Sequence, residues 1–243
     1  CRKRLSNMIS CERLDNESAG IMLRLFTGLF AGMMLVIAVV YPIGTLFGQV
    51  EDTPLPNLYP RLSDFSITHE NFTRDDDSVL DECTEPGEHR LLRFTISVAN
   101  NGAGDAYIGN PEDNPSLFVW SATHGHYHVA RFNEYRLLDA FGHEVAKGFK
   151  QGFCMIDIEP LTPRNPAPST GYDCENQGIS AGWADVYDAS LPCQFVELKN
   201  FSDGRYILEV RTNAHYVITE TTYGDNVARV RLNIAGDEVT QIR

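Results

Sequence analysis

The chain has 243 residues, of which 43% are hydrophobic and 10% aromatic, and it carries 33 acidic residues against 20 Lys and Arg. This apolar content is enough for a hydrophobic core and excludes a disordered chain. The net charge of −13 repels phosphate, which excludes a nucleic-acid-binding protein of the usual basic kind and favours cationic partners.

An uncharged segment divides this charge unevenly along the chain. Residues 1–24 hold five basic and three acidic residues, residues 25–50 hold no charge, and residues 51–243 hold 15 basic and 30 acidic residues. The apolar run at 25–47 is long enough to cross a bilayer core of about 30 Å as a helix. Basic residues before it predict that segment 1–24 is cytoplasmic and that the rest is translocated. A retained transmembrane anchor and a cleaved signal peptide remain alternatives, so we expect a membrane-anchored or secreted protein.

Beyond the apolar run, residues 51–90 are rich in Pro, Asp, Glu and Thr, and we expect an irregular lead-in there with one short strand at 64–68. From residue 91 onward, short β-branched runs alternate with turn signals. Strands are expected at 91–100, 126–132, 133–140, 143–153, 193–199, 205–212, 215–222 and 226–234. This spacing predicts an antiparallel β-sandwich with long loops, preceded by one N-terminal helix. Residues 159–169 contain four prolines and are predicted to be a loop.

Four of the six cysteines follow the apolar run, and their even number in an oxidising compartment predicts two disulfides. The alternative is four unpaired buried thiols. No two of these cysteines have the close spacing of a zinc ribbon. The same region contains two Asn-X-Ser/Thr motifs, at Asn71 and Asn200, which are acceptor sites for N-glycosylation if the host glycosylates.

Three histidines, His124, His126 and His128, occupy alternate positions in the sequence WSATHGHYHVARF. Alternate residues of a strand face the same side, but the first and last Cα atoms would lie about 13 Å apart on an extended strand. All three can bind one ion only if the chain bends, and Gly125 is the residue best able to allow a bend. Neutral imidazoles suit copper or zinc, so a copper oxidase and a zinc hydrolase both remain open. Hydrogen-bonded structural histidines are the third alternative.

Several longer motifs surround these histidines in a fixed order. They are W-x-x-x-H-x-H-Y-H at 120–128, F-x-x-Y-x-L-L-D-A at 132–140, V-A-x-G-x-K-x-x-F-C at 145–154 and G-x-x-D-x-Y-x-A-x-x-x-C-Q at 182–194. In order and spacing the sequence resembles the catalytic domain of the lysyl oxidase family over about residues 54–234. We therefore expect a catalytic domain at 91–243, on the extracytoplasmic side of the membrane or secreted.

The resemblance implies roles for particular residues. His124, His126 and His128 would bind copper, while Lys150 and Tyr187 would be the precursors of the family's lysine tyrosylquinone. The lysine amine, with a pKa of about 10.4 in water, must lose its proton to react, and the neighbouring phenylalanines at 149 and 153 would favour this by desolvation. Asp185, two residues before Tyr187, is our candidate for the base that removes a proton from the substrate.

The same resemblance pairs Cys154 with Cys174 and Cys83 with Cys193. It also implies a calcium site whose oxygen ligands come from both ends of the domain, namely Asn57, Leu58, Glu220, Asp225 and Asn226. Thr222 stands where the family usually has an acid. The sequence also departs from animal members at Phe149 and Ser121, which replace histidines.

These observations predict a copper-dependent amine oxidase that converts lysine side chains or other primary amines to aldehydes, releasing H2O2 and ammonia. The expected partners are O2, a cationic amine or lysine-rich protein substrate, and a membrane through segment 25–47, with no nucleic acid. A zinc-dependent hydrolase and a non-catalytic metal-binding β-sandwich are the alternatives.

Overall fold

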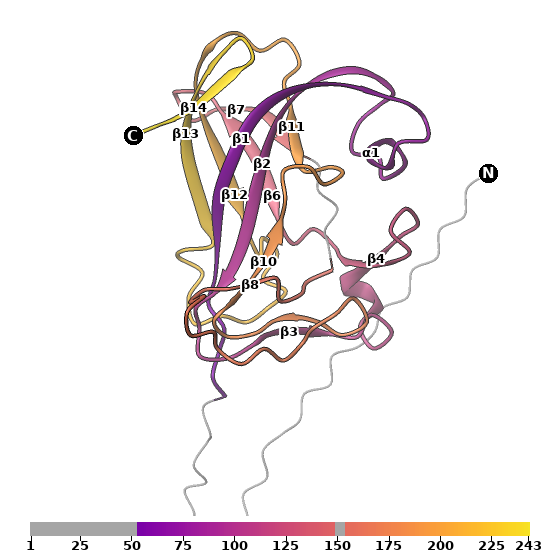
Figure 1. Cartoon of the computed structure of the whole chain (residues 1–243), viewed down its shortest axis with the longest axis vertical. Coiled ribbons are helices and arrows are strands. Elements are labelled where there is room, and N and C mark those ends of the chain that lie inside the picture. Colours follow the sequence, from indigo (N-terminus) through magenta and orange to yellow (C-terminus); the bar gives the residue numbers. More distant parts are fainter. Residues whose placement is uncertain (1–52, 149–153) are drawn as a thin grey trace, which may run out of the picture. The chain divides into compact units, whose positions relative to one another are not determined.

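The computed structural model describes residues 53–148 and 154–243, which form antiparallel sheets joined by loops (Figure 1). The expectation of a mainly β, antiparallel fold is confirmed. Within these two ranges the only α-helix is the four-residue α1 (Asp77–Leu80), accompanied by a short 3-10 turn, η1 (Pro115–Leu117). No helix in the described part of the chain is both long and apolar enough to span a membrane. The predicted cytoplasmic segment 1–24 and anchor 25–47 lie outside the described residues.

The first large sheet is organised around β2 (Gly87–Asn100), which is buried along its second half. It pairs with β1 (Leu58–Phe72), β10 (Trp183–Tyr187) and β11 (Phe195–Glu197), and β10 pairs in turn with β8 (Glu159–Pro160). Figure 1 shows β1 and β2 running side by side over most of their length. From Leu92 onward the sequence of β2 alternates. The apolar side chains Leu92, Phe94, Ile96 and Val98 belong to the main core cluster, whereas the polar side chains between them, Arg93, Thr95 and Ser97, are on the other face of the strand and are also buried.

The expected irregular lead-in at 51–90 is wrong over much of its length, since β1 and the start of β2 occupy it. Register runs from Leu58 opposite Asn100 to Phe72 opposite Gly87, with a bulge between Ser63 and Ser66. β1 lies at the edge of the sheet and many of its side chains are exposed, so polar residues are compatible with a strand there. Pairing with β2 therefore sets the length of β1, which its own sequence does not indicate.

The second large sheet has the strand order β14 (Glu238–Ile242), β13 (Val227–Ala235), β12 (Gly204–Arg211), β6 (Glu134–Leu138), β7 (Glu144–Gly148). Its apolar side chains share one core cluster with those of the first sheet. In that core the ring of Phe94 meets the ring of Tyr135 edge to face, with centroids 5.3 Å apart. The two large sheets are therefore held together by a common hydrophobic core.

A buried ion-pair cluster joins three strands of the second sheet. Glu209 of β12 is 2% exposed and is paired with Arg136 of β6 and Arg229 of β13.

The strand expected at 215–222 is also wrong, because this stretch forms turns. Tyr216 has a φ of +56°, and its N–H donates to the carbonyl of Asn213. The Asn213 side chain donates to the carbonyl of Ile218 and accepts from its N–H. These bonds use the backbone groups that a strand would offer to its neighbour. As a result, the segment forms a compact loop that holds Glu220 inside.

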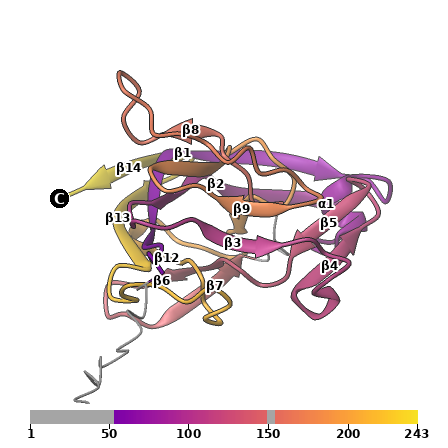
Figure 2. The same ribbon diagram turned by 90° about the horizontal axis from the view of Figure 1, so that it is seen from below.

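Two small two-stranded sheets complete the described structure (Figure 2). One pairs β3 (Ala106–Gly109) with β9 (Gln177–Ile179), and the other pairs β4 (Phe118–Ser121) with β5 (His126–Val129). Two disulfides are present: Cys83–Cys193 joins segments 110 residues apart in the sequence, and Cys154–Cys174 closes a loop of 20 residues. This is the pairing that the family resemblance implies.

Candidate functional site

The histidine cluster is built on the β4–β5 hairpin. Ser121 and His126 face each other across the hairpin, and the four residues between them form the turn. Gly125 closes this turn with a φ of +69°, and its N–H donates to the carbonyl of Ser121 at 2.9 Å. His124 therefore lies in the turn, while His126 and His128 lie on β5. The bend expected at Gly125 is present, and it places His124 in the turn rather than on β5.

This bend brings the three imidazole rings together. His124 Nδ1 lies 3.2 Å from His128 Nε2, which lies 3.1 Å from His126 Nε2. Two nitrogens bound to one ion at about 2.0 Å are separated by about 2.8–3.3 Å when the bond angle is 90–110°. The observed separations fall in that interval, and the three ligand atoms lie within 4.8 Å of one another. The cluster therefore fits a single metal ion held by three nitrogen ligands.

The protonation chemistry of the cluster is also compatible with a metal. Burial, together with the neighbouring His124, lowers the pKa of His126 below its usual value. A neutral imidazole keeps the lone pair that a metal binds. Nitrogen ligands suit copper and zinc, so the donor set by itself does not distinguish the two metals.

The turn that carries His124 is anchored to the segment after α1. The Thr123 hydroxyl donates to Asp81 Oδ1 at 2.9 Å and lies 2.9 Å from the Ser121 hydroxyl. The Ser121 hydroxyl also accepts a bond of 3.3 Å from the N–H of His124. Ser121, which departs from the family pattern, thus supports the turn without belonging to the ligand set.

Tyr187 and Asp185 lie on β10, two residues apart on the same side of the strand, and both are buried. The Tyr187 hydroxyl donates to Asp185 Oδ2. Burial raises the pKa of the Asp185 carboxyl to about 7. Burial and the adjacent Asp185 hold the pKa of the Tyr187 hydroxyl well above its usual value. The pair is therefore a tyrosine next to a carboxyl group that titrates near neutral pH.

Lys150 lies outside the described residues, together with the phenylalanines on either side of it. The described chain stops at Gly148, the last residue of β7, and resumes at Cys154. The role of Lys150 in a cross-link with Tyr187 therefore stays a prediction.

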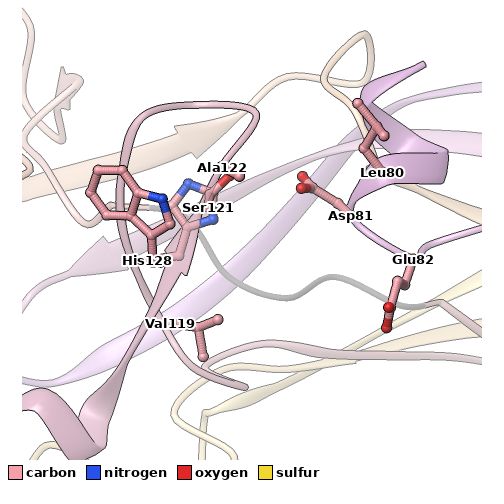
Figure 3. Close-up of a pocket in the computed structure, with 8 residues that line it drawn as sticks. Leu80, Asp81, Glu82, Val119, Ser121, Ala122 and His128 are labelled. Carbon is pink, nitrogen blue, oxygen red and sulfur yellow. The ribbon is translucent and has the colours of Figure 1, made fainter. Parts of the chain in front are cut away.

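A cavity of about 300 Å³ opens beside His128, between the end of α1 and the β4–β5 hairpin. Figure 3 shows Asp81 and Glu82 on one side of it and His128 with Val119 and Ser121 on the other. Trp120, which is 53% exposed, also lines the cavity. Sequence reasoning missed Asp81 and Glu82, because only the tertiary structure brings them next to the histidines.

The residues proposed for calcium lie together. The Leu58 N–H donates to Glu220 Oε2 at 2.5 Å, and the side chain of Asn226 donates to Glu220 Oε1 at 2.7 Å. The side chain of Asn57 donates to Asp225 Oδ2 at 2.8 Å. The Oδ1 atoms of Asn57 and Asn226 are buried and have no hydrogen-bond partner among the described residues. Two orphaned amide oxygens next to two carboxylates fit a hard cation, although Glu220 already accepts several N–H groups.

The two glycosylation motifs occupy exposed positions. Asn71 lies near the end of β1, and Asn200 lies in the turn after β11 with a φ of +55°. Both asparagines are therefore accessible, and their modification stays a prediction.

The hairpin geometry makes Gly125→Ala a direct test of the metal cluster. Alanine at a positive φ should cost about 1 kcal/mol of unfolding free energy and should weaken copper binding by about tenfold because the turn that places His124 relaxes. Gly236 is a matched control, since its φ is +56° and a methyl group added there would also meet open space. Gly236→Ala should lose similar stability in urea denaturation but bind copper normally in a titration of the apo-protein. Equal copper affinity in both variants would contradict the prediction.

Comparison with known proteins identifies the family. The family model described as lysyl oxidase matches residues 46–243. The chain is 32% identical to chicken lysyl oxidase homolog 2 over 166 residues, which are 67% of this chain and 20% of that protein. It is 34% identical to zebrafish lysyl oxidase homolog 3B over 157 residues, 63% of this chain and 19% of that protein.

Chicken protein-lysine 6-oxidase is 35% identical over 150 residues, which are 60% of this chain and 34% of that protein. The chain thus spans about a fifth to a third of the length of these relatives. A metal-bound CARDB domain from Pyrococcus furiosus aligns with 73% of this chain and 90% of its own, but its TM-score of 0.27 and identity of 9% are too low to bear on fold or function. The match over residues 46–243 places the chain in the lysyl oxidase family.

Proposed function

We propose that this protein is a copper-dependent amine oxidase that oxidises lysine side chains or other primary amines. The convergence of the ring nitrogens of His124, His126 and His128, at separations of 3.1 and 3.2 Å, is the observation that carries the proposal. Family membership favours copper over zinc in this nitrogen site. With copper and a quinone derived from Lys150 and Tyr187, the site would convert an amine, O2 and water into an aldehyde, ammonia and H2O2.

In this proposal Asp185 of β10 transfers protons, and Tyr187 of the same strand is held next to it. Tyr187 is buried and donates its hydroxyl proton to Asp185, so the ring is fixed in orientation and shielded from water. Asp185, with a pKa raised to about 7, is ionised in a large fraction of molecules at neutral pH and protonated in the rest. A carboxyl group of this kind can take up a proton from the carbon next to the substrate amine and release it later.

The cavity beside His128 is the proposed entrance for the substrate. Apolar atoms of Leu80, Val119 and Trp120 can pack against the stem of a lysine side chain, and the carboxylates of Asp81 and Glu82 attract its ammonium group. The acidic surface, with a net charge of −13 over the chain, would also concentrate a lysine-rich protein near the site. Two disulfides suit an extracytoplasmic location, either membrane-anchored or secreted.

Aerobic maturation with copper should cross-link Lys150 to Tyr187. Peptide mass spectrometry should detect the joined pair, and peroxide should appear when a primary amine is added. Lys150→Arg and Tyr187→Phe should each abolish the cross-link and lower amine oxidation by at least about 100-fold, because each removes a partner of the cofactor. Lys147→Arg and Tyr107→Phe are matched controls, since both side chains are exposed and should be dispensable.

Unmodified Lys150 and Tyr187 in copper-loaded, aerobically matured protein would contradict the oxidase. Bound zinc and an activity that persists without O2 would instead support the hydrolase alternative. Wild-type biological function in Tyr187→Phe would support a non-catalytic metal-binding β-sandwich.

Asp185 should set the acidic limb of the pH–rate profile. A base must be ionised to accept a proton, so kcat/KM should rise as pH increases through about 7, the pKa of this carboxyl. Asp185→Asn should lower kcat by about 100-fold and remove that limb. Steady-state kinetics between pH 5 and 9 measures both effects, with Asp188→Asn as an exposed neighbouring control. If the kcat/KM of Asp185→Asn still rises with pH through about 7, the rise belongs to the titration of another group.

We propose a calcium site at the second cluster. The carboxylates of Glu220 and Asp225, the unpartnered Oδ1 atoms of Asn57 and Asn226, and the carbonyl of Leu58 supply oxygen ligands of the kind that calcium prefers. The site would join the start of β1 to the loop before β13. Its role would be structural, because it would tie together the two ends of the domain.

Calcium should therefore stabilise the protein. At a free concentration of about 100 times the dissociation constant, it should add about 2.7 kcal/mol to the free energy of unfolding. Glu220→Gln should remove this gain, whereas Glu238→Gln, an exposed carboxylate on β14, should keep it. Urea denaturation with calcium or with a chelator provides the measurement. If calcium leaves wild-type stability unchanged, the site does not bind the ion.

A further inference from the structure

The buried side chain of Gln177 joins three separate backbone segments near the histidine cluster. Gln177 is the first residue of β9 and is fully buried. Its Oε1 accepts from the N–H of Met155 at 3.0 Å, and its Nε2 donates to the carbonyl of Tyr127 at 2.7 Å and to the carbonyl of Cys174 at 3.2 Å. One primary amide therefore satisfies three backbone groups away from water.

Each of the three contacts bears on the metal cluster. Tyr127 lies between His126 and His128 on β5. Within the described residues, β5 pairs with β4 in a two-stranded sheet. The bond to Tyr127 fixes the backbone from which both imidazoles project. Met155 follows Cys154, near the point where the described chain resumes after the segment that contains Lys150. The bonds to Met155 and Cys174 fix the segments on either side of the Cys154–Cys174 disulfide.

That disulfide lies next to the cluster. The ligand nitrogen of His126 and the sulfur atoms of Cys154 and Cys174 all lie within 4.8 Å of one another. A further backbone bond of 3.0 Å, from Gly178 N–H to the Met155 carbonyl, holds β9 to the same segment. Gln177 and the disulfide thus restrain the same two segments, and Gln177 also extends that restraint to the histidine strand.

We propose that Gln177 is a positioning residue that holds His126 and His128 in register with the chain following Lys150. The inference rests on the proposed copper site. Position 177 requires an amide side chain, because that side chain must accept one hydrogen bond and donate two. Glutamate can accept from Met155 but can donate at most one bond, and methionine has a similar length but forms none of the three.

The test compares Gln177→Met and Gln177→Glu with the wild-type chain. Copper(II) added to the apo-protein is followed by titration and by electron paramagnetic resonance, which reports the nitrogen ligands. Gln177→Met should bind copper about tenfold more weakly and give an altered spectrum. Hydrogen exchange of the apo-protein adds a readout without metal: the Met155 amide should lose protection in Gln177→Met and keep it in Gln177→Glu, which retains the acceptor.

Glu209→Gln is the control for a purely structural effect, because this buried carboxylate is paired with Arg136 and Arg229 in the other large sheet. It should lower stability and leave the copper affinity and spectrum unchanged. If Gln177→Met does not fold, Gln177→Glu carries the test with the same expected change in the copper spectrum. Wild-type copper affinity and spectrum in a folded Gln177 variant would overturn the proposal. Failure of the wild-type chain to bind copper through nitrogen would instead overturn the proposed function.

Discussion

The pairing of β2 with three other strands positions Tyr187 and Asp185 and one side of the proposed calcium site. One edge of β2 is covered by β1, and the other edge is shared by β10 and β11. Through β10 this pairing buries Tyr187 next to Asp185, opposite Ile96 and Val98. Through β1 it brings Leu58 opposite Asn100 and close to Glu220. Burial of the apolar side chains of β2 in the common core stabilises these positions together.

The metal cluster depends on a second, local constraint. Three histidines at alternate positions cannot converge on one ion from an extended strand, and the positive φ of Gly125 resolves this by turning His124 back over β5. The hairpin is small and belongs to neither large sheet. It is therefore anchored from outside, by Asp81 through Thr123 and by Gln177 through Tyr127. The same anchors define the cavity beside His128 and the position of the nearby disulfide.

Predictions from the sequence succeeded where a signal is local and failed where pairing overrides it. The alternating, β-branched pattern of β2 and the bend at Gly125 were both predictable from neighbouring residues. The polar edge strand β1 was not, because its partner rather than its composition makes it extended. The sequence of residues 215–222 has the β-branched and aromatic residues of a strand. The Asn213 side chain nevertheless forms hydrogen bonds with the backbone N–H and carbonyl of Ile218, which keeps this segment in turns.

The sequence by itself determined the family, the antiparallel β class and the residue types of the two candidate metal sites. Those properties depend on spacing along the chain, which a linear pattern records. Only the tertiary structure decided that Asp81 and Glu82 line the cavity next to His128, that Gln177 bridges three segments, and that Asn57 meets Asp225. Most of these contacts join residues that are 40 or more positions apart in the sequence. They arise from strand pairing and core packing, and a local sequence pattern carries no information about either.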